Sequence, residues 1–376
     1  MSLNVFMRPH IEMLAQDYDL TLIANGVANE FFVSNASGVK IMPVAIARDI
    51  NLIHDLKALL SLAGIFRREK FDAVHSITPK AGLLSMLAAT LTRTPVRVHT
   101  FTGQVWATKS GWVREGLKAL DRLIAWCATS LLTDSPSQRA FLIQEKIVAP
   151  EKIRVLGYGS VAGVDVNRFK PNANARQQIR SELHIGESEV VCLYLGRLNP
   201  DKGVQDLALA FAQIASQVPT AHLVIVGPDE ADMSTGIAQT LAACSAQYHR
   251  VGFTNKPEDY MAAADIFCLP SYREGFGSVL IEAAAAGVPS LASKIYGITD
   301  AVDDGKTGIL HEPKQVEQIA QGLLTLIQND QLRKSMATQA QERAYQLFGT
   351  AVLVEAMRDF YSQLFISQSH EKGYLI

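Results

Sequence analysis

The chain has 376 residues, of which 48% are hydrophobic and 19% charged, with a formal net charge of -2. This composition excludes a disordered protein. The length exceeds the size at which one hydrophobic core usually stops growing, so two domains of roughly 150 to 200 residues are expected. No apolar run approaches the ~20 residues that a membrane-spanning helix requires.

The four cysteines form no CxxC pair and no metal-ligand spacing, which favours a reducing, cytoplasmic compartment and argues against zinc. The first residues, MSLNVFMRPHIEML, include a charged residue at Arg8 and lack the long apolar core of a signal peptide. Residues 1–165 hold 18 Lys and Arg against 14 Asp and Glu. The front half is therefore expected to face an anionic partner or surface, with uneven surface charge of no consequence as the alternative.

Short apolar, β-branched runs alternate with helical patterns along the chain, which is typical of parallel sheets covered by helices on both faces. In the front half, strands are expected at residues 20–24, 39–43, 71–77, 96–101, 131–134 and 153–156. The second half restarts the rhythm, with strands at residues 190–195, 222–226, 266–269, 290–292 and 308–310. Glycines and a proline interrupt the pattern in GYGSVAGVDVNRFKPN, residues 157–172. The sequence therefore predicts two α/β domains, over residues 1–162 and 163–348, with 349–376 as a C-terminal helix that packs back toward the first.

The start departs from this rhythm, because residues 8–16 already have a helical pattern where a doubly wound domain has its first buried strand and glycine-rich turn. Either that first N-terminal strand is missing, or the few residues before Phe6 stand in for it.

The segment VVCLYLGRLNPDKG, residues 190–203, is the first with a concentration of cations. An apolar strand runs into Gly196, and Arg197 follows at its carboxyl end. Lys202 comes just before a helix that begins near Val204. Ligands of open α/β sheets bind at the carboxyl ends of strands, and Arg and Lys are common partners of phosphate oxygens. The segment indicates an anionic ligand; an ordinary solvated loop is the alternative.

The stretch YREGFGSVLIEAAAAGVP, residues 272–289, separates Glu274 from Glu282 by seven residues. Two glycines in between would each cost about 1 kcal/mol inside a helix, so Glu274 is expected on a loop. A helix should begin near Ser278, a favoured N-cap residue, with its free N–H groups forming an anion site. Glu282, one turn in, could accept hydrogen bonds from vicinal hydroxyls. Solvation explains Glu274 alone, and compensation of the helix dipole explains Glu282 alone. Taken together, a phosphate site beside a site for vicinal hydroxyls fits a nucleotide sugar.

These motifs together resemble those of the retaining glycosyltransferases of family 4, in particular bacterial surface-glycan enzymes. The segments that carry the resemblance are GSVAGVDVNRF, LGRLNPDKG, LVIVGPDE, VGFTNKPEDYMAAADIF, EGFGSVLIEAAAAGVP and DGKTGIL. The resemblance spans most of the chain and is strongest over residues 157–313. It implies the GT-B fold: two facing Rossmann-like domains with an interdomain cleft, the first binding the acceptor and the second the nucleotide sugar.

The resemblance also implies residue roles. Arg197, Lys202 and Glu274 would be the catalytic set, with the two cations on the donor diphosphate and Glu274 on the transferred sugar. Glu282 would bind the ribose, residues 251–254 the base, and the amides of 278 and 279 the phosphates. The full set of donor-binding positions is Gly196, Val251, Phe253, Thr254, Phe276, Gly277, Ser278, Val279 and Glu282. No metal or other cofactor is expected, because Arg and Lys supply the positive charge.

The acceptor is expected on loops at the carboxyl ends of the front-half strands. Candidate residues are His75 and Lys80 in VHSITPKAG, and His99 and Gln104 in HTFTGQVW. Both histidines are also explained as packing residues. Many family members have His-Gly where this chain has Gly103 and Gln104, so the chain departs from the family pattern at that position.

All three tryptophans lie in VWATKSGWVREGLKALDRLIAW, residues 105–126, together with Lys109, Arg114, Lys118 and Arg122. Aromatic and basic residues on an amphipathic helix suit a membrane surface, although ordinary helix packing also explains tryptophans. A polyprenyl-diphosphate-linked acceptor and peripheral contact with the inner face of the membrane would fit the first interpretation.

The predicted function is the retaining transfer of a hexose or N-acetylhexosamine from a nucleotide-sugar donor, with UDP as the expected carrier, to a hydroxyl of a lipid-linked glycan in bacterial polysaccharide assembly. Nucleic acid is not an expected partner. Two alternatives stay open. One is an enzyme similar to the UDP-N-acetylglucosamine 2-epimerases, which would have its catalytic carboxylates and histidine elsewhere. The other is a truncated relative that binds nucleotide or glycan without turnover.

Overall fold

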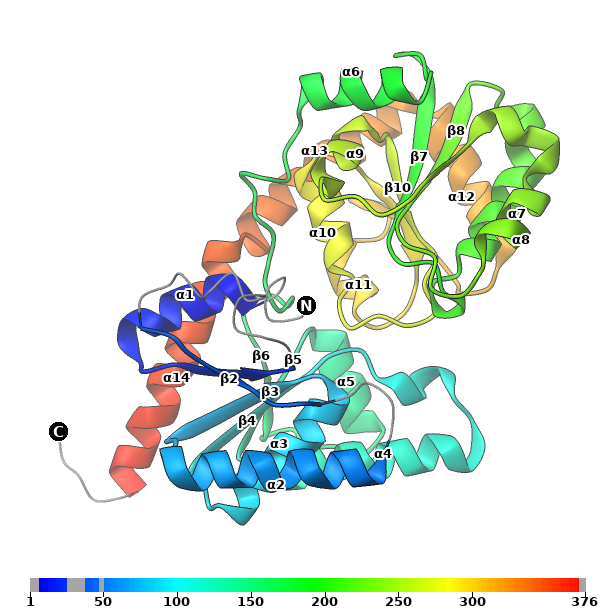
Figure 1. Cartoon of the computed structure of the whole chain (residues 1–376). Coiled ribbons are helices and arrows are strands. Elements are labelled where there is room, and N and C mark those ends of the chain that lie inside the picture. Colours follow the sequence, from blue (N-terminus) through cyan, green and yellow to red (C-terminus); the bar gives the residue numbers. More distant parts are fainter. Residues whose placement is uncertain (1–6, 26–37, 47–50, 372–376) are drawn as a thin grey trace. The chain divides into compact units, whose positions relative to one another are not determined.

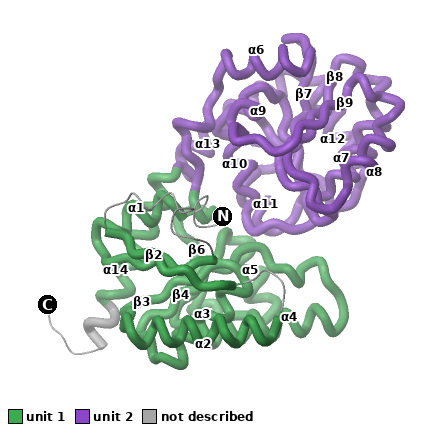
Figure 2. Tube along the Cα trace, in the orientation of Figure 1, with its two compact units in different colours: residues 1–162, 350–376 green, residues 163–349 purple. Residues whose placement is uncertain are grey.

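The computed structural model describes residues 7–25, 38–46 and 51–371. It divides into two compact units, residues 1–162 with 350–376 (unit 1) and residues 163–349 (unit 2), as Figure 2 shows. The boundaries predicted from the sequence lie at 162/163 and 348/349. The chain thus leaves unit 1 after its last strand and returns to it with its last helix.

Unit 1 alternates parallel strands with helices (Figure 1). Its strands are β1 (Thr21–Ala24), β2 (Lys40–Pro43), β3 (Ala73–Ile77), β4 (Val96–Phe101), β5 (Ser130–Thr133) and β6 (Ile153–Val155). Its helices are α1 (Arg8–Asp17), α2 (Leu52–Glu69), α3 (Pro79–Leu91), α4 (Gly111–Cys127), α5 (Pro136–Gln144) and α14 (Thr350–Glu371). The strands pair as β1-β2 and as β3-β4-β5-β6, every pair parallel. All six strands fall where the sequence predicts them.

The structure describes only part of the region in which the first strand of unit 1 was expected to be missing. The helix predicted from residue 8 is α1, with Pro9 at its first turn, where a missing N–H does no harm. Among the described residues, β1 pairs only with β2, and β3 only with β4. A strand formed by the residues before Phe6 would lie outside the described residues. α14 packs against α1 through Met357, Phe360 and Tyr361, which joins the end of the chain to unit 1.

Unit 2 is a doubly wound parallel sheet with the strand order β12-β11-β10-β7-β8-β9. Its strands are β7 (Val190–Leu195), β8 (Ala221–Val226), β9 (Tyr248–Val251), β10 (Ile266–Leu269), β11 (Ser290–Ser293) and β12 (Gly308–His311). Its helices are α6 (Ala173–Glu182), α7 (Val204–Ile214), α8 (Ser234–Thr240), α9 (Pro257–Ala263), α10 (Ser278–Ala285), α11 (Ile298–Ala301), α12 (Val316–Gln328) and α13 (Asp330–Leu347). The direction of strand succession reverses between β7 and β10, which are hydrogen-bonded neighbours. In such sheets this switch point is where ligands bind.

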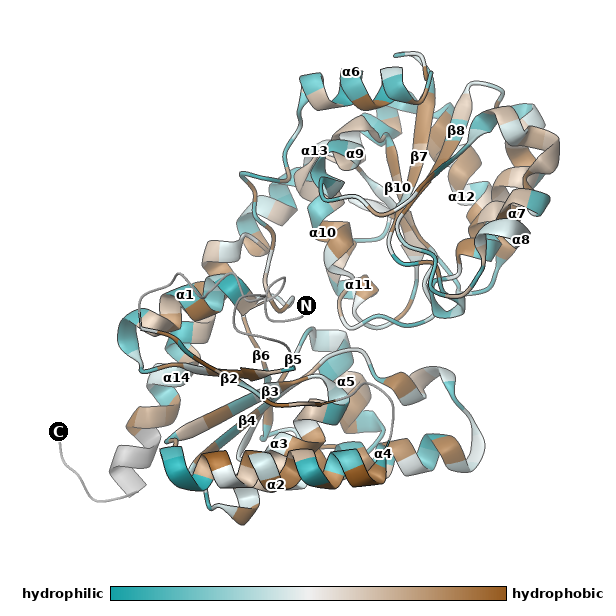
Figure 3. Ribbon diagram, in the orientation of Figure 1, coloured by the Kyte–Doolittle hydropathy of each residue, from teal (hydrophilic) through white to brown (hydrophobic). Residues whose placement is uncertain are grey.

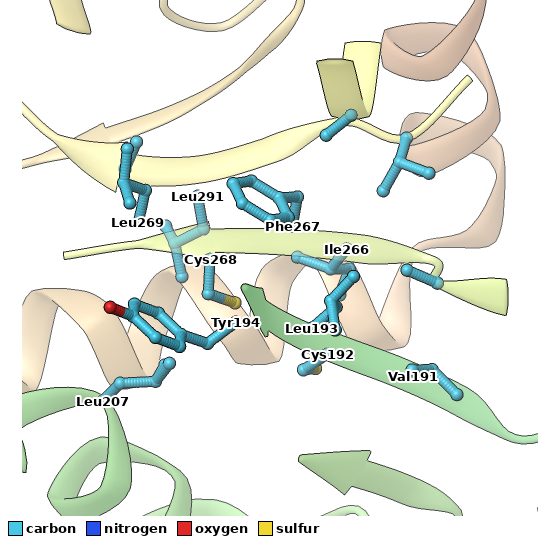
Figure 4. Close-up of a cluster of buried hydrophobic side chains, with 14 of the residues drawn as sticks. Val191, Cys192, Leu193, Tyr194, Leu207, Ile266, Phe267, Cys268, Leu269 and Leu291 are labelled. Carbon is cyan, nitrogen blue, oxygen red and sulfur yellow. The ribbon is translucent and has the colours of Figure 1, made fainter. Parts of the chain in front are cut away.

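The core of unit 2 explains why its strands are apolar throughout. Strands of a parallel sheet with helices on both faces are buried on both sides, and every residue of β8 and β10 is buried. Figure 4 shows side chains of β7 and β10 packed together, and in Figure 3 these strands are among the most hydrophobic segments. β9, which lies at the sheet edge, was missed by the sequence patterns because its residues, YHRV, are half-buried and largely polar.

Candidate active site

The two polar motifs of the second half come together at the switch point of unit 2. Arg197 and Lys202 lie in the loop after β7, and Glu274 lies in the loop after β10. β7 and β10 are adjacent and parallel, with Phe267 opposite Leu193. Their carboxyl ends therefore meet at the same edge of the sheet, and residues about 70 positions apart in the sequence share one site.

Lys202 and Glu274 form an ion pair across these two loops. Lys202 Nζ lies 2.5 Å from Glu274 Oε1, and the side chains are only 21% and 13% exposed. The same carboxylate oxygen accepts a hydrogen bond of 2.8 Å from Ser271 Oγ, whose residue is fully buried. The pair is partly shielded from water, so its Coulomb attraction is stronger than that of a surface pair. A cation and a carboxylate are thus held at the position predicted for the catalytic groups.

Further contacts hold the two loops at a fixed distance. The Tyr272 amide donates to the Asp201 carbonyl at 2.8 Å, and Arg273 Nη2 lies 3.2 Å from Asp201 Oδ2. Gly203 ends the first loop at φ 64°, and a Cβ atom there would come within 2.1 Å of the Pro270 carbonyl oxygen. Only glycine allows this approach of the backbones. The geometry of the Lys202–Glu274 pair therefore depends on the loops as a unit.

Arg197 stands apart from this pair. Its guanidinium is 53% exposed and its Nη1 lies 2.8 Å from Glu230 Oε2, in the loop after β8. Its backbone is fixed, since Tyr194 Oη donates to the Arg197 carbonyl at 2.9 Å and the Gly196 amide to Val226 at 2.9 Å. Exposed ion pairs contribute at most about 1 kcal/mol, so an anionic ligand could displace Glu230.

Helix α10 supplies the second half of the predicted site. It begins at Ser278, as expected, but Ser278 is not its N-cap. Gly277 occupies that position with φ 79°, and no side chain caps the helix. The prediction of a serine cap was wrong, because a left-handed residue is needed to turn the loop into the helix and glycine adopts that conformation without strain. The first N–H groups of α10 are consequently left without a side-chain acceptor, as an anion site requires.

Glu282 lies one turn into α10 and is half-buried. Burial raises its pKa to about 7, Arg168 acts to lower that pKa, and Glu258 acts to raise it. Near neutral pH this carboxyl is therefore divided between its charged and neutral forms. A carboxylate on an exposed helix would instead be fully charged at this pH.

The other residues predicted to bind the nucleotide-sugar donor differ in how far they are exposed. Phe253 is 66% exposed in the loop after β9, and Thr254 Oγ1 accepts a hydrogen bond from the Lys256 amide. Phe276 is buried and packs edge-on against Phe348, so only its backbone is available to a ligand. Val251 ends β9, and its carbonyl accepts from the Gly227 amide at 3.1 Å. Val279 is half-buried in the first turn of α10.

The acceptor candidates in unit 1 are engaged in internal contacts. His75 bonds with Tyr361 Oη and Thr100 Oγ1 at 2.8 and 2.7 Å, and His99 Nδ1 bonds with Ser76 Oγ at 2.8 Å. Burial lowers the pKa of His75 to about 4 and that of His99 to about 3, so both are neutral near pH 7. Lys80 pairs with Asp55 at 2.6 Å. These contacts account for the three residues as packing groups, and their acceptor roles stay predictions.

Gln104 likewise has internal partners. Its Nε2 donates to the Thr102 carbonyl at 2.7 Å, and its Oε1 accepts from Gln138 Nε2 at 3.0 Å. Gln138 Nε2 also donates to the Thr102 carbonyl. The two amides therefore fix the loop that follows β4. An acceptor role for Gln104, 3% exposed, also stays a prediction.

The aromatic and basic segment, residues 105–126, divides into a short 3-10 turn, Val105–Thr108, which contains Trp106, and the helix α4, which contains Trp112 and Trp126. Trp106 is buried, donates to Asp121 Oδ2 at 2.6 Å and is flanked by Arg114 and Lys118, both paired with Glu145. Packing, the alternative to a membrane surface, therefore accounts for Trp106, whose indole N–H is bonded to a buried carboxylate. Trp112 and Trp126 are 86% and 72% exposed.

Asp134, at the carboxyl end of β5, is a buried carboxyl that the sequence patterns did not single out. It is 5% exposed, and its Oδ1 has no hydrogen-bond partner among the described residues. It lines a small cavity with Thr100, Thr133 and Ser160. Burial raises its pKa to about 8. The only available signal was a polar residue directly after an apolar strand, which is common at surface loops as well.

The substitution Asp134→Asn is expected to stabilise unit 1 at alkaline pH. An unfolded Asp ionises near pH 4, whereas burial keeps the folded carboxyl neutral up to about pH 8. The stability provided by the neutral form is full below pH 4 and is lost as pH rises to 8. The advantage of the asparagine variant in thermal unfolding should therefore grow from pH 5 to pH 8. Asp303→Asn, on an exposed ion pair, serves as the control; equal pH profiles for the wild type and Asp134→Asn would contradict the assignment.

No group of three or more His, Cys, Asp and Glu side chains in residues 7–25, 38–46 and 51–371 is placed to hold a metal ion. No helix in that part of the chain is long and apolar enough to cross a membrane.

Comparison with known proteins identifies the family. The family model "Glycosyl transferases group 1" matches residues 175–343, and "Glycosyl transferase 4-like domain" matches residues 10–159. A capsular polysaccharide biosynthesis glycosyltransferase of Staphylococcus aureus, CapM, is 30% identical over 88% of this chain and 86% of its own. A UDP-Gal:alpha-D-GlcNAc-diphosphoundecaprenol alpha-1,3-galactosyltransferase of Escherichia coli is 29% identical over 86% and 83%.

Solved structures show the same fold. Sucrose-phosphate synthase of Thermosynechococcus elongatus superposes with a TM-score of 0.82 at 22% identity, over 96% of this chain and 93% of that one. Anabaena HepE in complex with UDP gives 0.77 at 20% identity, over 94% and 95%. Together with the switch-point site of unit 2, these matches lead to one conclusion: the chain belongs to the family 4 glycosyltransferases of the GT-B fold, enzymes that transfer a sugar from a nucleotide-sugar donor.

Proposed function

We propose that the chain transfers a hexose-type sugar from a UDP-linked donor to a hydroxyl of a lipid-linked glycan, with retention of the anomeric configuration. The observation that carries this proposal is the meeting of the Lys202–Glu274 pair with the uncapped start of α10 on the loops of two adjacent strands. A cation, a carboxylate and free N–H groups at one sheet edge fit a diphosphate bonded to a sugar.

In the proposed reaction, the amides of Ser278 and Val279 bind the phosphates together with Lys202. Arg197 joins them after the ligand displaces Glu230 from its exposed ion pair. The bond between the anomeric carbon and the diphosphate oxygen breaks, and the bond to the acceptor oxygen forms on the same face. The acceptor proton passes to a phosphate oxygen of the leaving nucleotide. Two cations and a helix N-terminus offset the charge that develops on the diphosphate, so the scheme uses no metal ion.

Glu274 is assigned to the sugar rather than to a covalent intermediate. Its Oε1 already has two partners, Lys202 Nζ and Ser271 Oγ. A carboxylate held in this way is well placed to accept hydrogen bonds from sugar hydroxyls through its other oxygen. Glu282 is assigned to the ribose, and the loop after β9 to the base.

A lipid-linked glycan is the acceptor class that the relatives favour. The Staphylococcus aureus protein is named for capsular polysaccharide biosynthesis, and the Escherichia coli enzyme acts on GlcNAc-diphosphoundecaprenol. The exposed surface of unit 1 supports contact with a membrane as well. α4 exposes Trp112, Trp126 and Leu120, and α2 exposes a stripe of Leu52, Ile53, Leu56 and Leu60. Exposed aromatic and aliphatic side chains near cations are typical of helices that bind anionic lipid surfaces.

Replacing Trp112 and Trp126 with serine is expected to weaken binding to vesicles that contain anionic lipid by about tenfold or more, because each indole buries apolar area in the membrane interface. Co-sedimentation with phosphatidylglycerol vesicles measures the change. Trp106 is unsuitable as a control, since it is buried; Phe253→Ser, an exposed aromatic in unit 2, is the matched variant. A wild-type protein that stays in the supernatant would rule out this membrane contact.

The function is tested by calorimetry with UDP, followed by incubation with UDP-sugars and GlcNAc-diphosphoundecaprenol and mass detection of the product. A product larger by one sugar, formed only with the acceptor present, supports the proposal. UDP binding without transfer to any glycan acceptor would instead favour a binding protein without turnover. Conversion of UDP-N-acetylglucosamine to its 2-epimer in the absence of acceptor would favour the epimerase alternative.

A further inference from the structure

Arg168 lies where three segments of unit 2 meet. It falls in the segment GSVAGVDVNRF, but the sequence assigned it no role and the proposed reaction does not use it. It belongs to the segment between β6 and α6. Glu258 lies in the first turn of α9, and Glu282 lies on α10, which packs against α9. These three residues are called the Arg168 cluster below.

The guanidinium of Arg168 is held on several sides. Its Nε and Nη2 lie 3.0 and 2.8 Å from Glu258 Oε2, and Nη2 also reaches the Asn255 carbonyl at 3.5 Å. Its Cζ lies 5.1 Å from the centre of the ring of the buried Phe169. Side-chain exposure is 45% for Arg168 and 24% for Glu258. An arginine fixed by a carboxylate, a carbonyl and a ring has lost most of its rotamer freedom.

Asn255 connects this arginine to the base-binding loop. Residues 252–256 form the loop that follows β9. The proposed base site is residues 251–254, which are the last residue of β9 and the first three of this loop. The Arg168–Asn255 contact therefore lies one residue beyond the base site. The adjacent turn is closed by Thr254 Oγ1, which accepts from the Lys256 amide at 3.0 Å. The Asn255 end of a largely exposed loop is thus bonded to a charged side chain from another segment.

Glu282 has the other connection to the cluster. Two charged groups act on this carboxyl: Arg168 favours its charged form and Glu258 opposes it. Arg343, on α13, donates to the Asp300 carbonyl and stacks on Phe348. Arg168 thus favours the charged form of a carboxyl at a half-buried position.

We propose that Arg168 is a positioning residue of the nucleoside site: held by Glu258, it orders the base-binding loop through Asn255 and adds a compensating positive charge for Glu282, the carboxyl proposed to bind the ribose. This inference rests on the proposed function, because it assumes that Glu282 and the loop after β9 bind a nucleoside. Arg168 acts through these groups and not on the phosphates, since its donor fork is already occupied by Glu258.

The test compares Arg168→Gln, Arg168→Lys and Glu258→Gln with the wild type by calorimetry, using uridine and UDP from pH 5.5 to 8.5. Arg168→Gln should weaken uridine and UDP by the same factor, about three- to tenfold at pH 7. It should also move the pH midpoint of binding upward by about half a pH unit, because Glu282 loses its cation. Arg168→Lys should keep the midpoint but lose part of the affinity, and Glu258→Gln should move the midpoint downward.

Lys334→Gln is the matched control, because it also removes one cation from a surface ion pair of unit 2, with Asp330 on α13. An effect of Arg168→Gln on UDP but not on uridine would overturn the inference in favour of direct phosphate binding. If Arg168→Gln bound UDP with the affinity of the wild type and with an unchanged pH midpoint, the inference would be overturned as well.

A second measurement separates this inference from the proposed function. The titration of Glu282 can be measured without any ligand. It is reported by the difference in melting temperature between a protein that has Glu282 and the same protein with Glu282→Gln, followed as a function of pH. Arg168→Gln should move that titration upward. A wild type that binds neither uridine nor UDP would contradict the proposed donor, whereas an unmoved titration of Glu282 in free Arg168→Gln protein would contradict the role of Arg168.

Discussion

Replacing Lys202 with alanine is expected to reduce kcat/KM for sugar transfer by about 10²- to 10³-fold, the usual effect of removing one group that stabilises developing charge. Two losses combine in this variant. The leaving diphosphate loses a cation, and Glu274, only 13% exposed, keeps a negative charge with no counter-ion beside the phosphate site. Repulsion from that carboxylate should weaken UDP binding in addition to slowing transfer.

The second loss can be separated from the first with a double variant. Lys202→Ala with Glu274→Gln should bind UDP more tightly than Lys202→Ala alone, because the uncompensated charge is gone, while its transfer rate stays low. The two substitutions should be strongly non-additive, as expected for groups 2.5 Å apart. Lys306→Ala, at an exposed pair with Asp303 in the same unit, should leave both quantities unchanged. Additive effects at Lys202 and Glu274 would show that the pair does not act as a unit.

Replacing Glu282 with glutamine is expected to weaken UDP binding by an amount that depends on pH. Burial raises the pKa of Glu282 to about 7, so the wild type has a carboxylate at pH 8 but mainly a neutral acid at pH 6. Hydrogen bonds to a charged acceptor contribute about 1.5–3 kcal/mol, more than those to a neutral one. The ratio of the two dissociation constants should therefore be small at pH 6 and rise by about tenfold at pH 8.

The comparison with Glu282→Gln also removes the titration of UDP itself, which is common to both proteins. Folding stability should change with pH in the opposite direction to UDP binding. Because the folded pKa is above that of an exposed glutamate, the stability from the neutral carboxyl is full at low pH and is lost as pH rises through 7. The glutamine variant should consequently melt no lower than the wild type at pH 8. A dissociation-constant ratio independent of pH would contradict the ribose assignment.

Several features of this protein follow from local sequence alone. The central strands of unit 2, β7, β8 and β10, are nearly continuous apolar runs, because a strand covered by helices on both faces is buried on both sides. Gly275 and Gly277 already separate Glu274 on a loop from Glu282 on a helix, since two glycines oppose a continuous helix. The order of Arg197, Lys202, Glu274 and Glu282 was enough to indicate a nucleotide-sugar site and the family.

Other features depend on contacts between residues far apart in the sequence. The partner of Lys202 is 72 residues away and becomes its neighbour only because β10 inserts beside β7. The same is true of Arg168 and Glu258, 90 residues apart. Gly277, and not Ser278, caps α10 because the direction of the incoming loop requires a left-handed residue. Trp106 and Trp112 have the same residue type six positions apart, yet one is buried against Asp121 and the other is exposed.

The sequence by itself thus determined the fold class and most of the strands and helices, and it indicated the chemical groups of the proposed donor site, since these depend on periodicity, on glycine and proline, and on side-chain chemistry close in the chain. Only the tertiary structure decided which charges pair, which histidines and tryptophans are buried, and which carboxyls have raised pKa values. The physical reason is that burial and electrostatics are set by whatever the fold brings within a few ångströms of a group, and that neighbourhood is assembled from distant segments.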